Sequence, residues 1–198
     1  MLRRPLLSSL SSLSMPLMLN PMKLTIAALA LTFGVMGLAA SASAQDAPKL
    51  LGRYDDWAAY SYGSGSERMC YAMTTPTKSL PAGANRGDVY FMVTHRPARG
   101  TKNEISMRIG YPFKDTSRPY AAIGKDQFQM FSGVKEGGEH SYWAWLEKPA
   151  EESKMVQALR AGASMEIRGT SQRDTLTTDT YSLKGSAAAL NKINETCK

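Results

Sequence analysis

The stretch that most constrains the fold runs from residue 86 to residue 114, because it alternates apolar and polar residues on both sides of a turn. Two runs in it have a period of two: Val89, Phe91 and Val93 in the first, and Ile105, Met107 and Ile109 in the second. That period places each set on one buried face of a strand. Residues 97–100 between the runs read Pro-Ala-Arg-Gly, in which proline restricts φ and glycine permits a turn. The stretch therefore predicts a β-hairpin at the centre of an all-β protein.

The rest of the chain adds short strand-like runs and two short helices. The predicted strands cover residues 57–62, 68–74, 121–123, 127–131, 141–146, 164–169 and 176–183, and residues 46–53 and 76–85 are predicted loops. One helix is predicted over 150–160, which begins with acids and ends with a base, and another from Ser186 to Cys197. Strands and helices do not alternate, so we expect an all-β sandwich or barrel with two short helices. Trp143 and Trp145 share one strand face, where we expect packing in a core or in a contact between sheets, with a sugar-stacking platform as the alternative.

Residues 1–44 are predicted to be a cleaved signal peptide. Leu24–Ala40 carries no charge, and Ala42-Ser43-Ala44 presents the small residues that a signal peptidase reads, with cleavage after Ala44. A membrane anchor is the alternative, but a run of about 17 residues is at the lower limit for crossing a bilayer. A start at Met22 would give a more ordinary signal peptide. The protein is therefore expected in the periplasm, the cell envelope or the medium, without a transmembrane span after cleavage.

Residues 45–198 are predicted to form a single domain, long enough to bury a core. The whole chain has 24 basic and 17 acidic residues, and three of the bases lie in the leader, which leaves a net charge of +4. Bases and acids are interspersed along the sequence. This distribution does not indicate nucleic-acid binding.

Cys70 and Cys197 are the only cysteines, and both follow the predicted leader. In an oxidising compartment we expect them to form one disulfide. Two unrelated buried thiols are the alternative. A redox-active pair is disfavoured because the two are not spaced as C-x-x-C.

The search for catalytic, cofactor-binding or metal-binding residues identifies none. His95 and His140 are the only histidines, and neither has a partner at metal-ligand spacing. The candidate interaction residues are Arg86 and Asp88, which belong to an RGD adhesion tripeptide, and Arg96, Arg99 and Lys102, around the hairpin turn. The basic group could contact an anionic envelope component. The alternative for the RGD tripeptide is a plain turn, and the alternative for the basic group is a solvated hairpin tip.

Several segments carry a resemblance to a known family. They are Cys70-Tyr71-Ala72, RGDVYFMVTHRP over residues 86–97, NEISMRIGYPFK over 103–114, GTS over 169–171, DTYSL over 179–183, and Cys197. Together they resemble the invasion-associated locus B family of bacterial envelope proteins. The resemblance implies an exported protein with an immunoglobulin-like β-sandwich, no catalytic residues and no cofactor, linked through its founding member to host-cell invasion.

The favoured function is thus a non-enzymatic envelope binding or interaction module, whose partner is an unknown protein or an anionic envelope component. An adhesin-like secreted factor is the first alternative. A periplasmic hydrolase is the second, and it would need a cleft that pairs a carboxylate with a histidine.

Overall fold

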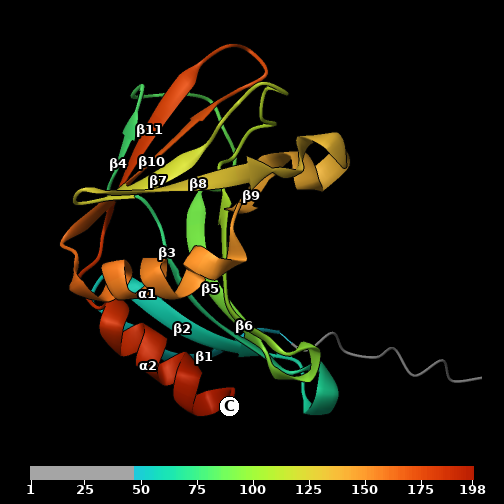
Figure 1. The fold of residues 1–198 in the computed structure, drawn as a ribbon, viewed down its shortest axis with the longest axis vertical. Helices are drawn as coiled ribbons and strands as arrows, with labels where there is room; N and C mark the ends of the chain where they lie inside the picture. Colours follow the sequence, from blue (N-terminus) through green and yellow to red (C-terminus); the bar gives the residue numbers. More distant parts are fainter. Residues whose placement is uncertain (1–46) are drawn as a thin grey trace, which may run out of the picture. The chain divides into compact units, whose positions relative to one another are not determined.

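The computed structural model describes residues 47–198, in which eleven strands form one antiparallel sheet and two α-helices pack on it (Figure 1). The strands are β1 (Lys49–Tyr54), β2 (Trp57–Tyr62), β3 (Met69–Thr74), β4 (Lys78–Leu80), β5 (Tyr90–Arg96), β6 (Thr101–Arg108), β7 (Tyr120–Ile123), β8 (Asp126–Ser132), β9 (Trp143–Leu146), β10 (Ser164–Thr170) and β11 (Leu176–Ser182). The helices are α1 (Glu152–Ala161) and α2 (Ser186–Thr196). Five short 3₁₀ turns complete the described elements: η1 (Gly65–Glu67), η2 (Pro97–Arg99), η3 (Gly133–Lys135), η4 (Gly138–Tyr142) and η5 (Pro149–Glu151). The predicted class, all-β with two short helices, is confirmed.

The predicted hairpin is β5 and β6. Phe91 lies opposite Met107 and Val93 opposite Ile105, and all four side chains are buried. The connection is the 3₁₀ turn η2, which ends at Gly100 with φ of 65°, a conformation that glycine adopts without steric cost. The period-two pattern and the turn residues therefore predicted this hairpin correctly.

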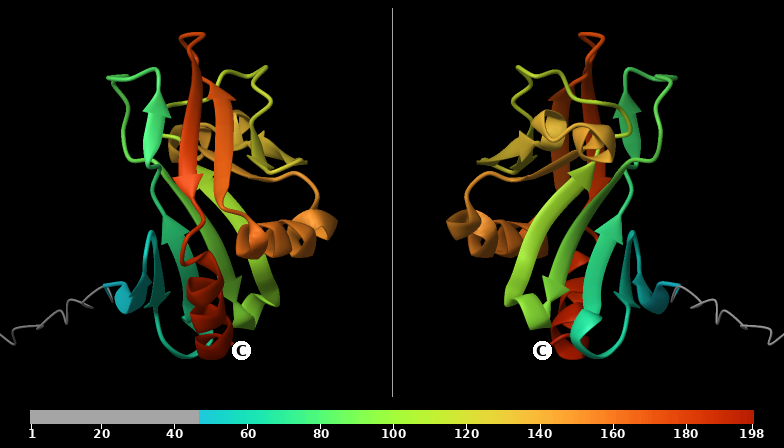
Figure 2. Two further views of the ribbon diagram at one scale, coloured as in Figure 1. Left: turned by 90° about the vertical axis from the view of Figure 1, so that its left-hand side faces the viewer. Right: turned by 90° about the vertical axis from the view of Figure 1, so that its right-hand side faces the viewer.

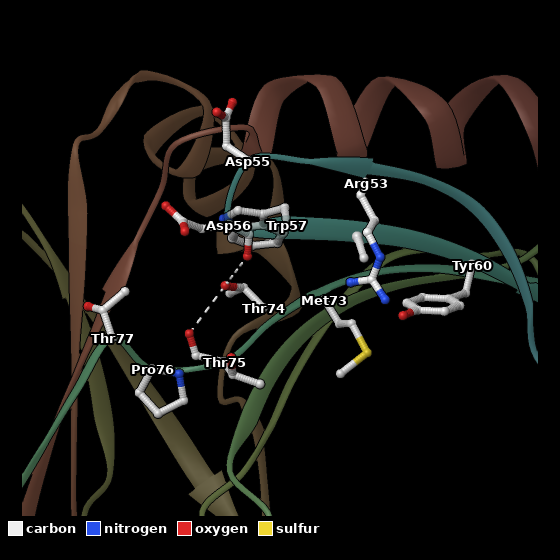
Figure 3. Close-up of a pocket in the computed structure, with 11 residues that line it drawn as sticks. Arg53, Asp55, Asp56, Trp57, Tyr60, Met73, Thr74, Thr75, Pro76 and Thr77 are labelled. Atoms are coloured by element: carbon white, nitrogen blue, oxygen red, sulfur yellow. Dashed lines mark hydrogen bonds between the residues drawn. The ribbon is translucent and has the colours of Figure 1, made fainter.

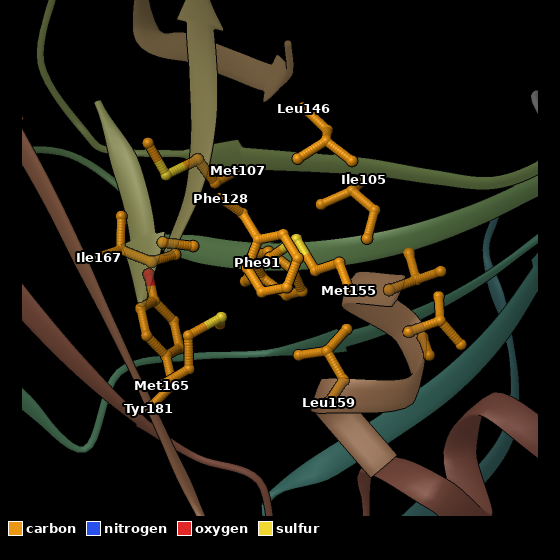
Figure 4. Close-up of a cluster of buried hydrophobic side chains, with 14 of the residues drawn as sticks. Phe91, Ile105, Met107, Phe128, Leu146, Met155, Leu159, Met165, Ile167 and Tyr181 are labelled. Carbon is orange, nitrogen blue, oxygen red and sulfur yellow. The ribbon is translucent and has the colours of Figure 1, made fainter. Parts of the chain in front are cut away.

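The strands follow the order β1-β2-β3-β5-β6-β9-β8-β7-β10-β11-β4, and the sheet folds back on itself at β8. β8 pairs with β9 on one side and with β7 on the other. As a result, Phe91 of β5 and Tyr181 of β11 pack together with ring centroids 6.4 Å apart, although their strands are not neighbours. Figure 4 shows the core, in which side chains from β5 and β6 meet those from β10 and β11. The immunoglobulin-like arrangement of the strands stays a prediction.

Both helices contribute apolar side chains to this core. α1 buries Met155, Val156 and Leu159, as its apolar spacing predicted. α2 packs against β1, β2 and β3. The N-cap of α2 is Gly185, and the buried Ser186 hydroxyl donates to the Leu159 carbonyl at 2.7 Å, which links the two helices.

Two predicted loops contain strands. Residues 49–54 form β1, which pairs with β2 and has an irregularity between Leu50 and Gly52. Residues 78–80 form β4, which pairs with β11 at the far edge of the sheet. Neither segment has a clear apolar alternation in its sequence. Each is an edge strand, which backbone hydrogen bonds to a single neighbouring strand hold in place.

The predicted disulfide is confirmed. Cys70 on β3 and Cys197, directly after α2, are bonded with their Cα atoms 5.9 Å apart, and both are buried. The bridge ties the last helix to an early strand and is compatible with an exported protein.

The predicted signal peptide, its cleavage after Ala44 and the alternative start at Met22 lie outside the described residues. They stay predictions, as does the assignment of residues 45–198 to one domain. From residue 47 on, the structure contains no helix that is both long and apolar enough to cross a membrane.

Candidate functional site

The sheet face opposite α2 carries aromatic and methionine side chains, whereas one face of an antiparallel sheet is commonly polar. In the right-hand view of Figure 2, β3, β5 and β6 lie in front and α2 lies behind them. β3 shows the alternation: Cys70 and Ala72 are buried on the helix side, while Met69, Tyr71 and Met73 are half-buried on the other side. We call this second side the outer face. Its aromatic and methionine side chains are those of Tyr60, Tyr62, Met69, Tyr71, Met73, Tyr90, Met92, Trp143 and Trp145. Ser106 and Arg108 of β6 lie on the same face, between the strands that carry Tyr90 and Trp143.

The strand register brings these side chains together. Met73 of β3 lies opposite Met92 of β5. The rings of Tyr60 and Tyr71 are stacked with centroids 5.2 Å apart. Such cross-strand pairs stabilise a sheet, and here they also make the outer face continuous.

The two tryptophans of β9 lie on this outer face. Trp143 and Trp145 are half-buried, while Ala144 and Leu146 between and beyond them are buried in the core. The expectation that the tryptophans pack in the core is therefore wrong, because the alternation of β9 points the smaller side chains inward. The Trp143 ring meets Tyr90 edge-on, with centroids 5.5 Å apart and planes at 77°.

An apolar groove of about 380 Å³ runs across the outer face. It is lined by Pro48, Tyr62, Met69, Tyr71, Met73, Tyr90, Met92 and Trp143. No charged side chain is among them. Burial raises the pKa of Tyr71, and it also raises the pKa of Tyr90 against the opposing effect of Arg108. Both phenols therefore stay neutral at ordinary pH, and the side chains that line the groove are uncharged.

The groove adjoins a polar pocket of about 270 Å³, and Met73 lines both (Figure 3). In Figure 3 the Arg53 guanidinium lies beside Tyr60 and Met73. The Thr74 hydroxyl donates to the Asp56 carbonyl at 2.7 Å and holds the wall of the pocket in place. Among the described residues, neither Arg53 nor the Asp56 carboxylate has an ion-pair partner, so the polar pocket, unlike the groove, can meet charged or polar groups.

The structure separates the five predicted interaction residues into two places. Arg86 and Asp88 precede β5, whereas Arg96, Arg99 and Lys102 lie around η2 at the other end of that strand. Arg99 and Lys102 are exposed, and Arg96 pairs with Glu104. The proposed contact of the three basic residues with an anionic envelope component stays a prediction.

Arg86 does not extend into solvent beside Asp88. Its side chain is only 7% exposed and forms an ion pair with the fully buried Asp179 of β11. The Gly87 N–H donates to the Gly110 carbonyl at 2.7 Å. This geometry is that of a structural ion pair and gives no support to an adhesive role for the tripeptide.

His95 is buried and has both ring nitrogens occupied. Its Nδ1 accepts the Asn103 N–H at 3.0 Å, so the proton is on Nε2, which lies 2.9 Å from Asn194 Oδ1. Burial lowers the pKa of His95 below 6.5. Within residues 47–198 no cluster of three or more His, Cys, Asp or Glu residues could hold a metal ion.

The state of His95 predicts a pH-dependent stability. Because its pKa is lower in the folded than in the unfolded protein, the unfolded protein binds more protons between the two values. The free energy of unfolding should therefore fall as the pH drops below 6.5, until the folded-state pKa is passed. Urea unfolding across this range should show a weaker pH dependence for His95→Gln than for the unmodified protein. His140→Gln, at a histidine of the exposed turn η4, is the control, and an unchanged slope in His95→Gln contradicts the prediction.

Sequence reasoning did not find the groove, although a signal was present. In residues 69–73, Met-Cys-Tyr-Ala-Met, both phases of the strand alternation are apolar or aromatic. A strand of this kind, in a sheet whose other face already packs on helices, indicates a second surface to cover.

Comparison with known proteins identifies the fold. No family model matches the chain, and no curated protein matches it. One matching solved structure is the crystal structure of invasion associated protein B from Bartonella henselae, with a TM-score of 0.52 and 15% sequence identity. The match covers 73% of this chain and 96% of that chain. The resemblance inferred from the sequence is thus confirmed at the level of the fold.

Proposed function

We propose that this chain, which shares its fold with invasion associated protein B, is an exported, non-enzymatic binding protein of the bacterial envelope. Its outer face binds an apolar, uncharged segment of a partner protein. The observation that carries this proposal is the groove of tyrosine, methionine and tryptophan side chains, which residues 47–198 leave open. Envelope location is supported by the leader pattern of residues 1–44 and by the disulfide.

The chemistry of the groove favours a polypeptide as the occupant. An uncharged lining selects an uncharged segment, because a buried charge without a partner is costly. Met69, Met73 and Met92 are flexible and can adapt to apolar side chains of different shape. The hydroxyls of Tyr62, Tyr71 and Tyr90 can hydrogen-bond to the amide groups of a bound peptide, which a hydrocarbon chain lacks.

Site-specific crosslinking tests the proposal. A photoreactive amino acid in place of Met92 is irradiated in envelope extract, and the crosslinked partner segment is identified by mass spectrometry. The expected segment is apolar and uncharged. A synthetic peptide of that segment is then titrated against the protein. An acidic or basic segment, or no crosslink, contradicts the proposal.

A matched pair of variants locates the binding surface. Met92→Asp places a carboxylate in the groove and should weaken peptide binding about tenfold or more, as loss of a central contact does. Leu176→Asp is the control, because Leu176 is 56% exposed on β11 and does not line the groove. Circular dichroism confirms that both variants are folded. Equal peptide affinity in the two variants would place binding elsewhere.

A further inference from the structure

A third cavity, of about 250 Å³, lies at the other end of the sheet, between the segment of residues 81–86 and the turn of residues 171–175. It is lined by Pro81, Ala84, Asn85, Arg86, Tyr111, Ser171, Arg173, Thr175 and Thr177. We call it the Arg86 cavity. It shares no residue with the groove of the outer face.

Arg86 supplies hydrogen-bond donors to this cavity. Its Nη2 donates to Asp179 Oδ1 and to Ser79 Oγ, the latter at 2.9 Å. Its Nη1 reaches only the Ile109 carbonyl, at the long distance of 3.5 Å. A guanidinium carries five N–H donors, so these three contacts leave two of them without a protein acceptor among the described residues. The side chain is only 7% exposed, and its ion pair with Asp179 fixes one edge of the guanidinium.

The neighbouring hydroxyls are also fixed by the protein. Tyr111 Oη lies 2.9 Å from the Gly169 carbonyl and 2.7 Å from Thr177 Oγ1. Since a carbonyl only accepts, Tyr111 donates to Gly169 and Thr177 donates to Tyr111. Burial raises the pKa of Tyr111 to about 12, so the phenol adds no negative charge. Ser171 Oγ accepts the N–H groups of Arg173 and Thr175, and its own hydroxyl proton remains available.

Arg173 stands at the mouth of the cavity. Its Nη2 donates to the Asn85 carbonyl at 3.2 Å, which joins the two segments that form the rim. Among the described residues it has no carboxylate partner, because the adjacent Asp174 pairs with Lys114. The positive charge of Arg86 is balanced by Asp179, whereas that of Arg173 is not. The charge of the cavity is therefore positive.

We infer that the Arg86 cavity binds a small oxyanion, a carboxylate or phosphate group, that accepts hydrogen bonds from Arg86, Arg173 and Ser171. Guanidinium groups match the paired oxygens of such anions. Pro81, Ala84 and the ring of Tyr111 form apolar walls, which suit a compact organic body attached to the anion.

Titration of the oxidised protein with sodium phosphate, sodium acetate and sodium succinate tests the inference. Sodium chloride at equal ionic strength is the reference, and the backbone amide resonances of residues 171–177 are followed by NMR. Saturable shifts with phosphate, with the carboxylates or with both support an oxyanion site. Saturation by phosphate alone assigns a phosphate group to the ligand, and saturation by acetate or succinate alone assigns a carboxylate. Shifts that chloride reproduces, or that do not saturate with any of the three salts, overturn the inference.

Two exposed arginines provide the matched variants. Arg173→Gln should weaken the oxyanion affinity about tenfold, as expected for loss of one charge-assisted hydrogen bond. Arg99→Gln removes an equally exposed arginine at the hairpin tip and should leave the affinity unchanged. An unchanged affinity in Arg173→Gln overturns the inference and leaves the proposal for the outer face untouched.

Discussion

Replacing Cys70 and Cys197 together by alanine is expected to lower the free energy of unfolding by about 4–5 kcal/mol. The bridge joins residues separated by 127 positions, and in the unfolded chain it removes the many conformations in which these residues lie far apart. A loss of this size approaches the whole stability of many domains. The double variant should therefore unfold at a much lower denaturant concentration than the oxidised protein.

Guanidinium chloride unfolding of the double variant and of the oxidised protein measures the difference. Each single variant leaves one buried thiol unpaired, so the double variant is the cleaner comparison. The oxidised protein treated with a reductant serves as the control, since it loses the bridge without a change of sequence. If the double variant and the oxidised protein unfold within about 1 kcal/mol of each other, the bridge does not stabilise the fold as the loop length predicts.

Replacing Asp179 by alanine is expected to destabilise the protein by about 3–5 kcal/mol, because Arg86 would remain buried without its counter-ion. Asp179 is fully buried, and Oδ1 accepts hydrogen bonds from Arg86 and from Ser79, the latter at 2.6 Å. Its Oδ2 has no partner in the described part of the chain, which makes the site costly even when the pair is intact.

The exposed pair of Lys114 and Asp174 provides the control for this experiment. Their side chains are 40% and 69% exposed, so Asp174→Asn should cost no more than about 1 kcal/mol. The double variant Arg86→Met and Asp179→Leu removes both charges and should regain much of the lost stability. Urea unfolding of the three variants measures these differences. An Asp179→Ala variant as stable as Asp174→Asn would show that the buried pair is not required.

The elements that were predicted correctly are those whose pattern lies within a short stretch of sequence. β5 and β6 were predicted correctly because Phe91, Val93, Ile105 and Met107 alternate cleanly around a turn with a proline and a glycine. β1 and β4 were missed because their hydrogen bonds to β2 and β11 arise from the tertiary arrangement and leave no period in the sequence.

The candidate sites were harder to predict because they depend on residues far apart in the chain. The pairing of Arg86 with Asp179 joins positions 93 residues apart and requires that β4 and β11 share a sheet edge. To predict the groove, one would have to know which apolar face of the sheet the helices cover. Met69 and Cys70 are adjacent in the sequence, and both are apolar. Their side chains point to opposite faces of the sheet, and α2 covers only the face that carries Cys70, so Met69 stays accessible.

The long separation between the two bridged cysteines has a consequence for biogenesis. In the proposed export, Cys70 would leave the translocation channel well before Cys197, and the stretch between them would have to follow before the bond could close. Until then the emerging chain is held together by non-covalent contacts alone, and it remains accessible to chaperones and proteases. On the proposed export route, only a molecule that has passed through the channel at least as far as Cys197 could form the disulfide, so the oxidised form would mark complete translocation.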